Sequence, residues 1–280
     1  MKRPTKKQVL KVAGYTGATL VIVAIAAANV AMALFGDTID AFLGGGTVDI
    51  SDTEKTAVME DGRDLARRIE GEGIVLLRNE DATLPLARST NRVNVFGWAS
   101  TQWVAGGSGS GQVSGKTQGL LDALTAAGIE YNTELASMYQ GFHGERDYQT
   151  AGALNSRASE FCRLYEPSIY DRGCYSQELL DNAKNFSDTA IVVLGRTAGE
   201  SVDCPSVQYK VNARGGEVTA DVTRGYLELS SEEESLLRYV GANYAHVVVV
   251  VNSTNTMELG EVQTTPGIGA VMLAGPTGEV

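Results

Sequence analysis

The sequence has little of what several kinds of binding site require. Only two of its 280 residues are histidine and three are cysteine, and no histidine stands at ligand spacing from a cysteine. We therefore expect neither a metal site nor another cofactor. Positive charge is also scarce. The formal net charge of −11 argues against a nucleic-acid partner, because such a partner requires a basic face.

The three cysteines are Cys162, Cys174 and Cys204. In an exported chain an odd number leaves at least one thiol unpaired. Cys162 and Cys174 lie in one segment and could form a disulfide, but three free or buried thiols fit the sequence equally well. The spacing leaves both alternatives open.

The N-terminus combines a basic tail with a long uncharged stretch. Five cations lie between Lys2 and Lys11, and no charged residue occurs in residues 12–35. This stretch is long enough to cross a bilayer, and the cations favour a cytoplasmic N-terminus. Ala31-Met32-Ala33 also fits a signal-peptide cleavage site, but the stretch is longer than the usual apolar region of a signal peptide.

We therefore predict a basic cytoplasmic tail at residues 1–11, a single transmembrane anchor at 12–35 and a linker at 36–59. The glycines at 44–46 would make that linker flexible. This topology places the remaining domain, 60–280, outside the cell at the cell membrane.

Apolar runs of strand length alternate with helical patterns from residue 60 onward. Thr189–Gly195, His246–Asn252 and Ile268–Gly275 are continuous Val/Ile/Leu/Ala runs, which is typical of strands covered on both faces by helices. The pattern predicts a three-layer α/β sandwich with a mainly parallel sheet. Ile74–Leu77 is expected to be buried on all sides. Residues 140–173 break the rhythm and are interpreted as a surface insertion.

Ligands in such folds bind outside the carboxyl ends of the strands. One predicted strand is followed by Trp98 and the glycine-rich run Gly106–Gly111, and another by Arg196 and the sequence TAGESVDCP. The glycine-rich run lacks the spacing of a dinucleotide or phosphate loop, which argues against nucleotide binding. It is either a flexible loop or a loop that closes over a sugar.

Four sequence blocks in order resemble the second domain of glycoside hydrolase family 3, the β-glucosidase and β-N-acetylhexosaminidase family. They are ARRIEGEGIVLLRNEDATLPL, then VNVFGWAS with GGSGSG, then AIVVLGRTAGESVDCP, and finally YLELSSEEES through AVMLAGPTGEV. The resemblance extends from about Glu60 to Val280.

The resemblance implies site residues at the strand ends. The expected catalytic carboxylates are Glu200 and Asp203, and the alternative for both is a solvated turn that braces the loop. In several branches of the family the general acid/base opens the helix after the glycine-rich loop, where this chain has Gln118, with Asp122 one turn further on. Glutamine cannot donate and recover a proton. The expected substrate-binding residues are Trp98, Ser108, Gly109, Ser110 and Arg196.

The family's nucleophile is an aspartate on a (β/α) barrel, and no Ser-Asp-Trp-type motif occurs in these residues. We therefore expect part of a membrane-anchored, exo-acting, retaining β-glucosidase-like enzyme that acts on a β-linked glucoside or oligosaccharide. Its barrel would follow in reversed domain order, and residues 1–280 alone would be inactive. The sandwich would be incomplete at its C-terminal end, leaving one face of Ile268–Gly275 partly uncovered. The alternative is a non-catalytic extracellular carbohydrate-binding or interaction module.

Overall fold

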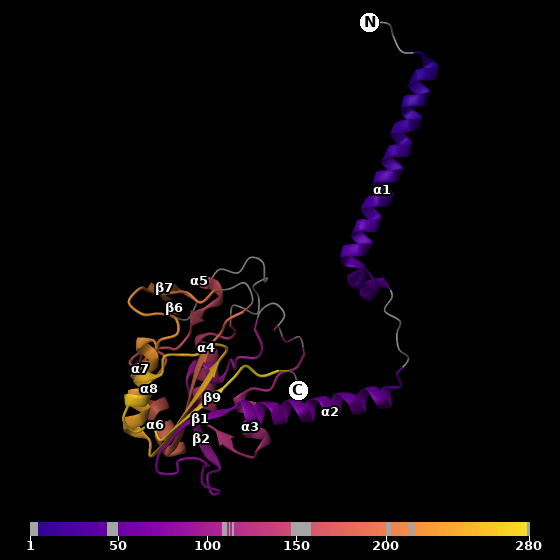
Figure 1. Cartoon of the computed structure of the whole chain (residues 1–280). Helices are drawn as coiled ribbons and strands as arrows, with labels where there is room; N and C mark the ends of the chain where they lie inside the picture. The colour runs from indigo at the N-terminus through magenta and orange to yellow at the C-terminus, as the bar shows by residue number, and fades with distance from the viewer. Residues whose placement is uncertain are drawn as a thin grey trace. The chain divides into compact units, whose positions relative to one another are not determined.

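The computed structural model describes residues 5–43, 50–107, 111, 113, 115–146, 158–199, 203–212 and 216–278. The chain divides into two compact units, residues 1–59 and 60–280. Figure 1 shows the elements of both units, which are described separately below.

The first unit is mainly the helix α1, Lys6–Leu43, which departs from helical geometry at Phe35. Residues Lys6–Gly36 are long and apolar enough to cross a membrane: an 18-residue stretch within them has a mean hydropathy of 2.3, and none of that stretch is buried. A signal sequence would meet the same criterion. The polar residues expected to form a linker are partly helical, because α2 runs from Asp52 to Gly73.

The second unit is built on a six-stranded sheet with the order β1-β9-β8-β5-β2-β3. Every neighbouring pair is parallel except β1 with β9. The predicted mainly parallel sheet is therefore confirmed. The strands are β1 (Val75–Asn79), β2 (Arg92–Phe96), β3 (Glu130–Tyr131), β5 (Thr189–Arg196), β8 (His246–Ser253) and β9 (Ala270–Ala274).

Each face of this sheet carries its own apolar core, which gives the three layers. One face packs against α4 (Thr133–Phe142), α6 (Gln177–Phe186), α7 (Ser231–Asn243) and α8 (Gly260–Thr264), and the other against α3 (Leu120–Ala126) (Figure 1). Successive residues of β5 alternate between the cores: Val192 and Leu194 face the first, Ile191 and Val193 the second. Burial on both faces explains why β5 is apolar throughout.

Local sequence signals fix the helix ends. Ser176 caps α6 by accepting from the backbone N–H of Leu179, and Ser230 forms a capping box with Glu233 at the start of α7. Gly128, with φ of 74°, follows the end of α3, where a left-handed residue is usually glycine.

The expectation that Ile74–Leu77 is buried on all sides is wrong. Val75, Leu76 and Leu77 are 45–51% exposed. The reason is position: β1 is the outermost strand of the sheet and pairs on one side only, antiparallel to β9. β1 is thus an incompletely covered apolar strand. In β9, Ala270, Val271 and Ala274 are buried, and Met272 and Leu273 are partly exposed, so the expected incomplete cover of Ile268–Gly275 stays a prediction.

The interpretation of residues 140–173 as a surface insertion is also wrong for its described part. Phe142, Tyr165 and Ile169 belong to the larger core. The short helix α5 (Ala158–Phe161) leads into β4 (Arg163–Leu164), which is part of a second, three-stranded sheet with the order β4-β6-β7. In this sheet β6 (Gln208–Val211) and β7 (Val218–Asp221) form an antiparallel pair. Aromatic side chains at irregular spacing form this part of the core, so no helical or strand period reveals it.

Candidate functional site

The carboxyl ends of four parallel strands, β2, β5, β8 and β9, lie at one edge of the sheet. Their loops are tied to one another by the backbone. Gly106 N donates to Thr277 O at 2.9 Å, and Thr277 N donates to Val104 O at 3.2 Å. The loop after β2 is therefore held against the loop after β9, across the end of β8.

The side chain of Asn252, near the end of β8, binds the loop after β2 and the loop after β9. Its fully buried amide accepts from Val104 N and donates to Gly275 O at 3.0 Å. The loop after β5 also lies close: a Cβ at Gly107 would stand 3.0 Å from Ala198 O. The segments that flank the predicted sugar-binding loop and the predicted catalytic turn are thus neighbours.

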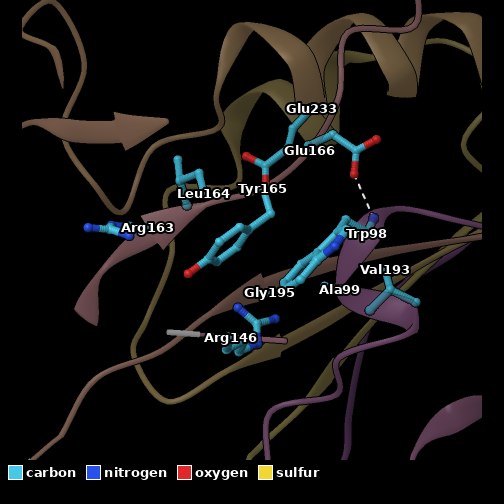
Figure 2. A pocket seen from close by; sticks show the side chains of 10 residues that line it. All are labelled: Trp98, Ala99, Arg146, Arg163, Leu164, Tyr165, Glu166, Val193, Gly195 and Glu233. Carbon is cyan, nitrogen blue, oxygen red and sulfur yellow. Dashed lines mark hydrogen bonds between the residues drawn. The ribbon is translucent and has the colours of Figure 1, made fainter. Parts of the chain in front are cut away.

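Trp98 lies directly after β2 and is only 2% exposed. Tyr165 stacks on its ring with centroids 4.2 Å apart, and the Arg146 guanidinium lies 4.9 Å from the ring centroid (Figure 2). The Trp98 indole N–H donates to the backbone carbonyl of His143 at 2.7 Å. The predicted contact between Trp98 and substrate stays a prediction, and in this conformation the ring is packed against protein groups.

Arg196, at the end of β5, is fully buried. Its guanidinium forms two 2.7 Å hydrogen bonds with the Glu233 carboxylate and also donates to the carbonyls of Gly195, Tyr226 and Glu228. These five bonds use all five N–H donors of an arginine. The predicted contact of Arg196 with substrate also stays a prediction; the geometry assigns the side chain to holding α7 and the preceding loop on the strand end.

Glu166 is a partly buried carboxyl at this edge that sequence reasoning missed. It accepts from the Trp98 backbone N–H at 2.7 Å (Figure 2) and from the Tyr175 hydroxyl at 2.8 Å. Burial is the main cause that raises the pKa of this carboxyl to about 8, against the lowering effect of both hydrogen bonds. Its neighbours come from distant segments, so no local pattern marked it.

A cavity of about 20 Å³ lies between Trp98, Glu166 and Glu233 (Figure 2). That volume holds about one water molecule and no monosaccharide. A sugar at this edge would therefore have to bind further out, among the loops.

The other predicted site residues fall on those loops. Asp203 is exposed, and the next residue, Cys204, accepts a hydrogen bond from Asn255 of the loop after β8. Glu200, Ser108, Gly109 and Ser110 lie outside the described residues. Gln118 and Asp122 are exposed, on either side of the start of α3.

The cysteine alternatives are resolved in favour of thiols. None of the three forms a disulfide: Cys162 and Cys174 are buried thiols, and Cys204 is an exposed thiol. Burial raises the pKa of the Cys162 thiol to about 12, so this side chain stays protonated and unreactive. Among the described residues no group of histidine, cysteine or carboxylate side chains could hold a metal ion.

Two β-glucosidases resemble the chain in sequence. The β-glucosidase of Ruminococcus albus is 28% identical over 199 residues, covering 70% of this chain and 18% of the relative. β-Glucosidase A of Butyrivibrio fibrisolvens is 23% identical over 210 residues, covering 72% of this chain and 24% of the relative. The chain thus spans about a fifth to a quarter of the length of these enzymes.

Solved structures of β-glucosidases resemble the chain in fold. A β-glucosidase from Paenibacillus barengoltzii has a TM-score of 0.56 and 28% identity, over 75% of this chain and 21% of that chain. β-Glucosidase 3B from Thermotoga neapolitana, in complex with glucose, has a TM-score of 0.53 and 23% identity, over 77% of this chain and 27% of that chain. The family model of the glycosyl hydrolase family 3 C-terminal domain matches residues 74–280. The chain therefore belongs to glycosyl hydrolase family 3 and contains the C-terminal domain of that family.

Proposed function

We propose that the chain is the sandwich portion of a membrane-anchored, exo-acting, retaining β-glucosidase. The observation that carries the proposal is the 28% identity to the Ruminococcus albus β-glucosidase over 70% of the chain. The substrate would be a β-linked glucoside or oligosaccharide.

A retaining glycosidase needs two carboxyl groups, one nucleophile and one acid/base. In the proposed enzyme the nucleophile is an aspartate on a barrel domain outside residues 1–280. The sandwich supplies the loops after β2 and β5, with Glu200 as the acid/base and Asp203 beside it. The close approach of Gly107 to Ala198 supports this division, because it brings both loop bases to one place.

Glu200→Gln in the full-length protein tests the acid/base assignment. Loss of the proton donor should lower kcat/KM for glucosides with poor leaving groups by about 10²–10⁴-fold. Activated aryl glucosides should be affected far less in the glycosylation step, because their leaving group needs no proton. Added azide should restore their turnover, and steady-state kinetics with both substrate types measures each effect.

Glu130→Gln is a matched control, because Glu130 is an exposed carboxylate at the amino end of β3, on the opposite edge of the sheet. This variant should leave kcat/KM unchanged for both substrate types. A different result would be that Glu200→Gln lowers kcat/KM equally for both substrate types, with no recovery in azide. That result would mean that Glu200 only stabilises its loop. The search would then turn to Asp203, Asp122 or a residue outside this chain.

A non-catalytic carbohydrate-binding module is the second candidate. The observation that favours it is Gln118, exposed where several branches of the family have their acid/base. Binding of glucosides without hydrolysis by the full-length protein would establish this candidate in place of the first.

Membrane anchoring is a separate part of the proposal. Because an 18-residue stretch of Lys6–Gly36 has no buried residue and a mean hydropathy of 2.3, the intact chain should stay in the membrane pellet after carbonate extraction. Ile25→Arg, at the centre of the segment, should release a substantial fraction, since arginine there opposes insertion by about 2.5–3.5 kcal/mol. A soluble mature form beginning near Leu34 would instead identify a cleaved signal peptide.

A further inference from the structure

The turn after β2 is held by a closed set of side-chain hydrogen bonds. Gly97 N donates to the Tyr139 hydroxyl at 2.7 Å, and the next amide, Trp98 N, donates to Glu166 at 2.7 Å. Tyr175 joins the two acceptors, because its hydroxyl lies 2.5 Å from the Tyr139 hydroxyl and 2.8 Å from the other oxygen of Glu166. Two consecutive backbone amides therefore depend on one network, termed here the turn network: Tyr139, Tyr175 and Glu166.

The backbone of this turn lies close against β5. Gly97 has φ of 91°, and a Cβ there would lie 2.2 Å from Val193 O on β5. The chain then continues through the short helix η1, Trp98–Ser100, towards Val104 and the glycine-rich loop. Trp98 thus connects the Glu166 carboxyl to the segment that leads to that loop.

Glu166 is the member of the turn network whose charge can change near neutral pH. The groups that face it are the Tyr175 hydroxyl and the Trp98 amide, which favour the ionised form, and Glu232 and Glu233 of α7, which oppose it. Burial outweighs the two hydrogen bonds, and the pKa is raised to about 8. Burial also raises the pKa values of Tyr139 and Tyr175, so both phenols stay protonated.

Two arginines belong to the same surroundings. Arg146 and Arg163 line the small cavity together with Glu166, and each has a partner elsewhere: Arg146 donates to Gln102 O and Arg163 to Ser159 O. The cavity is large enough for one water molecule, and Glu166 itself is only partly buried.

We propose that Glu166 is a positioning residue for the glycine-rich loop and that release of its proton to solvent loosens the turn after β2. The protonated carboxyl is tolerated where it lies. The ionised carboxylate is poorly solvated there, so its formation favours conformations in which Glu166 leaves the turn. The assignment of that loop to sugar binding rests on the proposed function; the effect on the turn does not.

Tryptophan fluorescence of the full chain provides a readout that needs no catalytic activity. The chain has two tryptophans, so Trp103→Phe leaves Trp98 as the single reporter. Between pH 6 and 9.5 its emission should change with a midpoint near pH 8, and Glu166→Gln in the same background should abolish the change. Tyr175→Phe should raise the midpoint, because it removes a hydrogen bond that favours the carboxylate.

Tyr170→Phe is the matched control, since Tyr170 is an exposed tyrosine in the same segment, and it should leave the midpoint unchanged. Glu232→Gln covers the case in which Glu166→Gln does not fold, because removing a neighbouring negative charge should lower the midpoint. The proposal would be overturned if the Trp103→Phe protein shows no pH-dependent change in emission. It would also be overturned if that change persists when Glu166→Gln is added.

Hydrolysis by the full-length protein separates this inference from the proposed function. If both hold, kcat/KM of the wild-type protein should fall over the same pH window, and Glu166→Gln should flatten that limb of the profile. A fluorescence transition that depends on Glu166 in a protein without hydrolytic activity would support the role of Glu166 in the turn and reject the β-glucosidase assignment.

Discussion

Replacing Arg196 by methionine should lower the free energy of unfolding by about 3–5 kcal/mol. The substitution leaves the Glu233 carboxylate buried without its counter-charge, and it removes the donors that bind the carbonyls of Tyr226 and Glu228. Urea unfolding of the full chain, followed by circular dichroism, measures the change.

Arg92→Met is the matched control. Arg92 also pairs with a glutamate, Glu130, but the two side chains are 54% and 63% exposed. An exposed pair contributes about 0–1 kcal/mol, so this variant should be nearly as stable as the parent. Arg196→Met combined with Glu233→Leu should recover much of the loss, because no unpaired charge then remains buried. Unchanged stability of Arg196→Met with a raised KM would instead favour a direct contact between Arg196 and substrate.

Gly97→Ala should be among the most destabilising single-methyl additions in the domain. Its backbone conformation, φ 91° and ψ 124°, costs an alanine about 1–3 kcal/mol. Crowding against Val193 O, at 2.2 Å, should add roughly 1–3 kcal/mol, because a backbone carbonyl in the middle of β5 cannot rotate away as a side chain can. Thermal and urea unfolding report the sum.

Gly128→Ala separates the two contributions. Gly128 also has positive φ, 74°, but no atom lies within 4 Å of the position that an added methyl group would take. This variant should lose only the conformational part. Equal losses in the two variants would mean that the close approach of Gly97 to β5 contributes nothing.

The layered fold could be predicted because its information is local. Strands covered on both faces must be apolar at every position, and β5 and β8 are largely so. Helix caps are equally local, since the Ser230–Glu233 capping box depends on residues three apart. Burial of Ile74–Leu77 could not be predicted in the same way, because it depends on which strand occupies the edge of the sheet.

The candidate site was predictable only in its location. Strand ends identified Trp98, Arg196 and Asp203, since the parallel topology brings those positions to one edge. The surroundings of each residue depend on contacts from segments distant in sequence. Tyr165 covers Trp98, and Glu233 satisfies Arg196. Glu166 belongs to a region whose aromatic residues have no period, so its role emerges only in three dimensions.

The antiparallel pairing of β1 with β9 has a consequence for synthesis of the protein. Val75 pairs with Leu273, so the first strand of the sheet to leave the ribosome is completed by the last strand of the same sheet. Protein synthesis adds roughly 5–20 residues per second, so on the order of 10–40 s separate the synthesis of β1 from that of β9. The apolar side chains of β1 remain unpaired during that time. Contacts of such long range also slow folding itself. During that interval Leu76 and Leu77 would be open to chaperones, or to the same strand of another nascent chain.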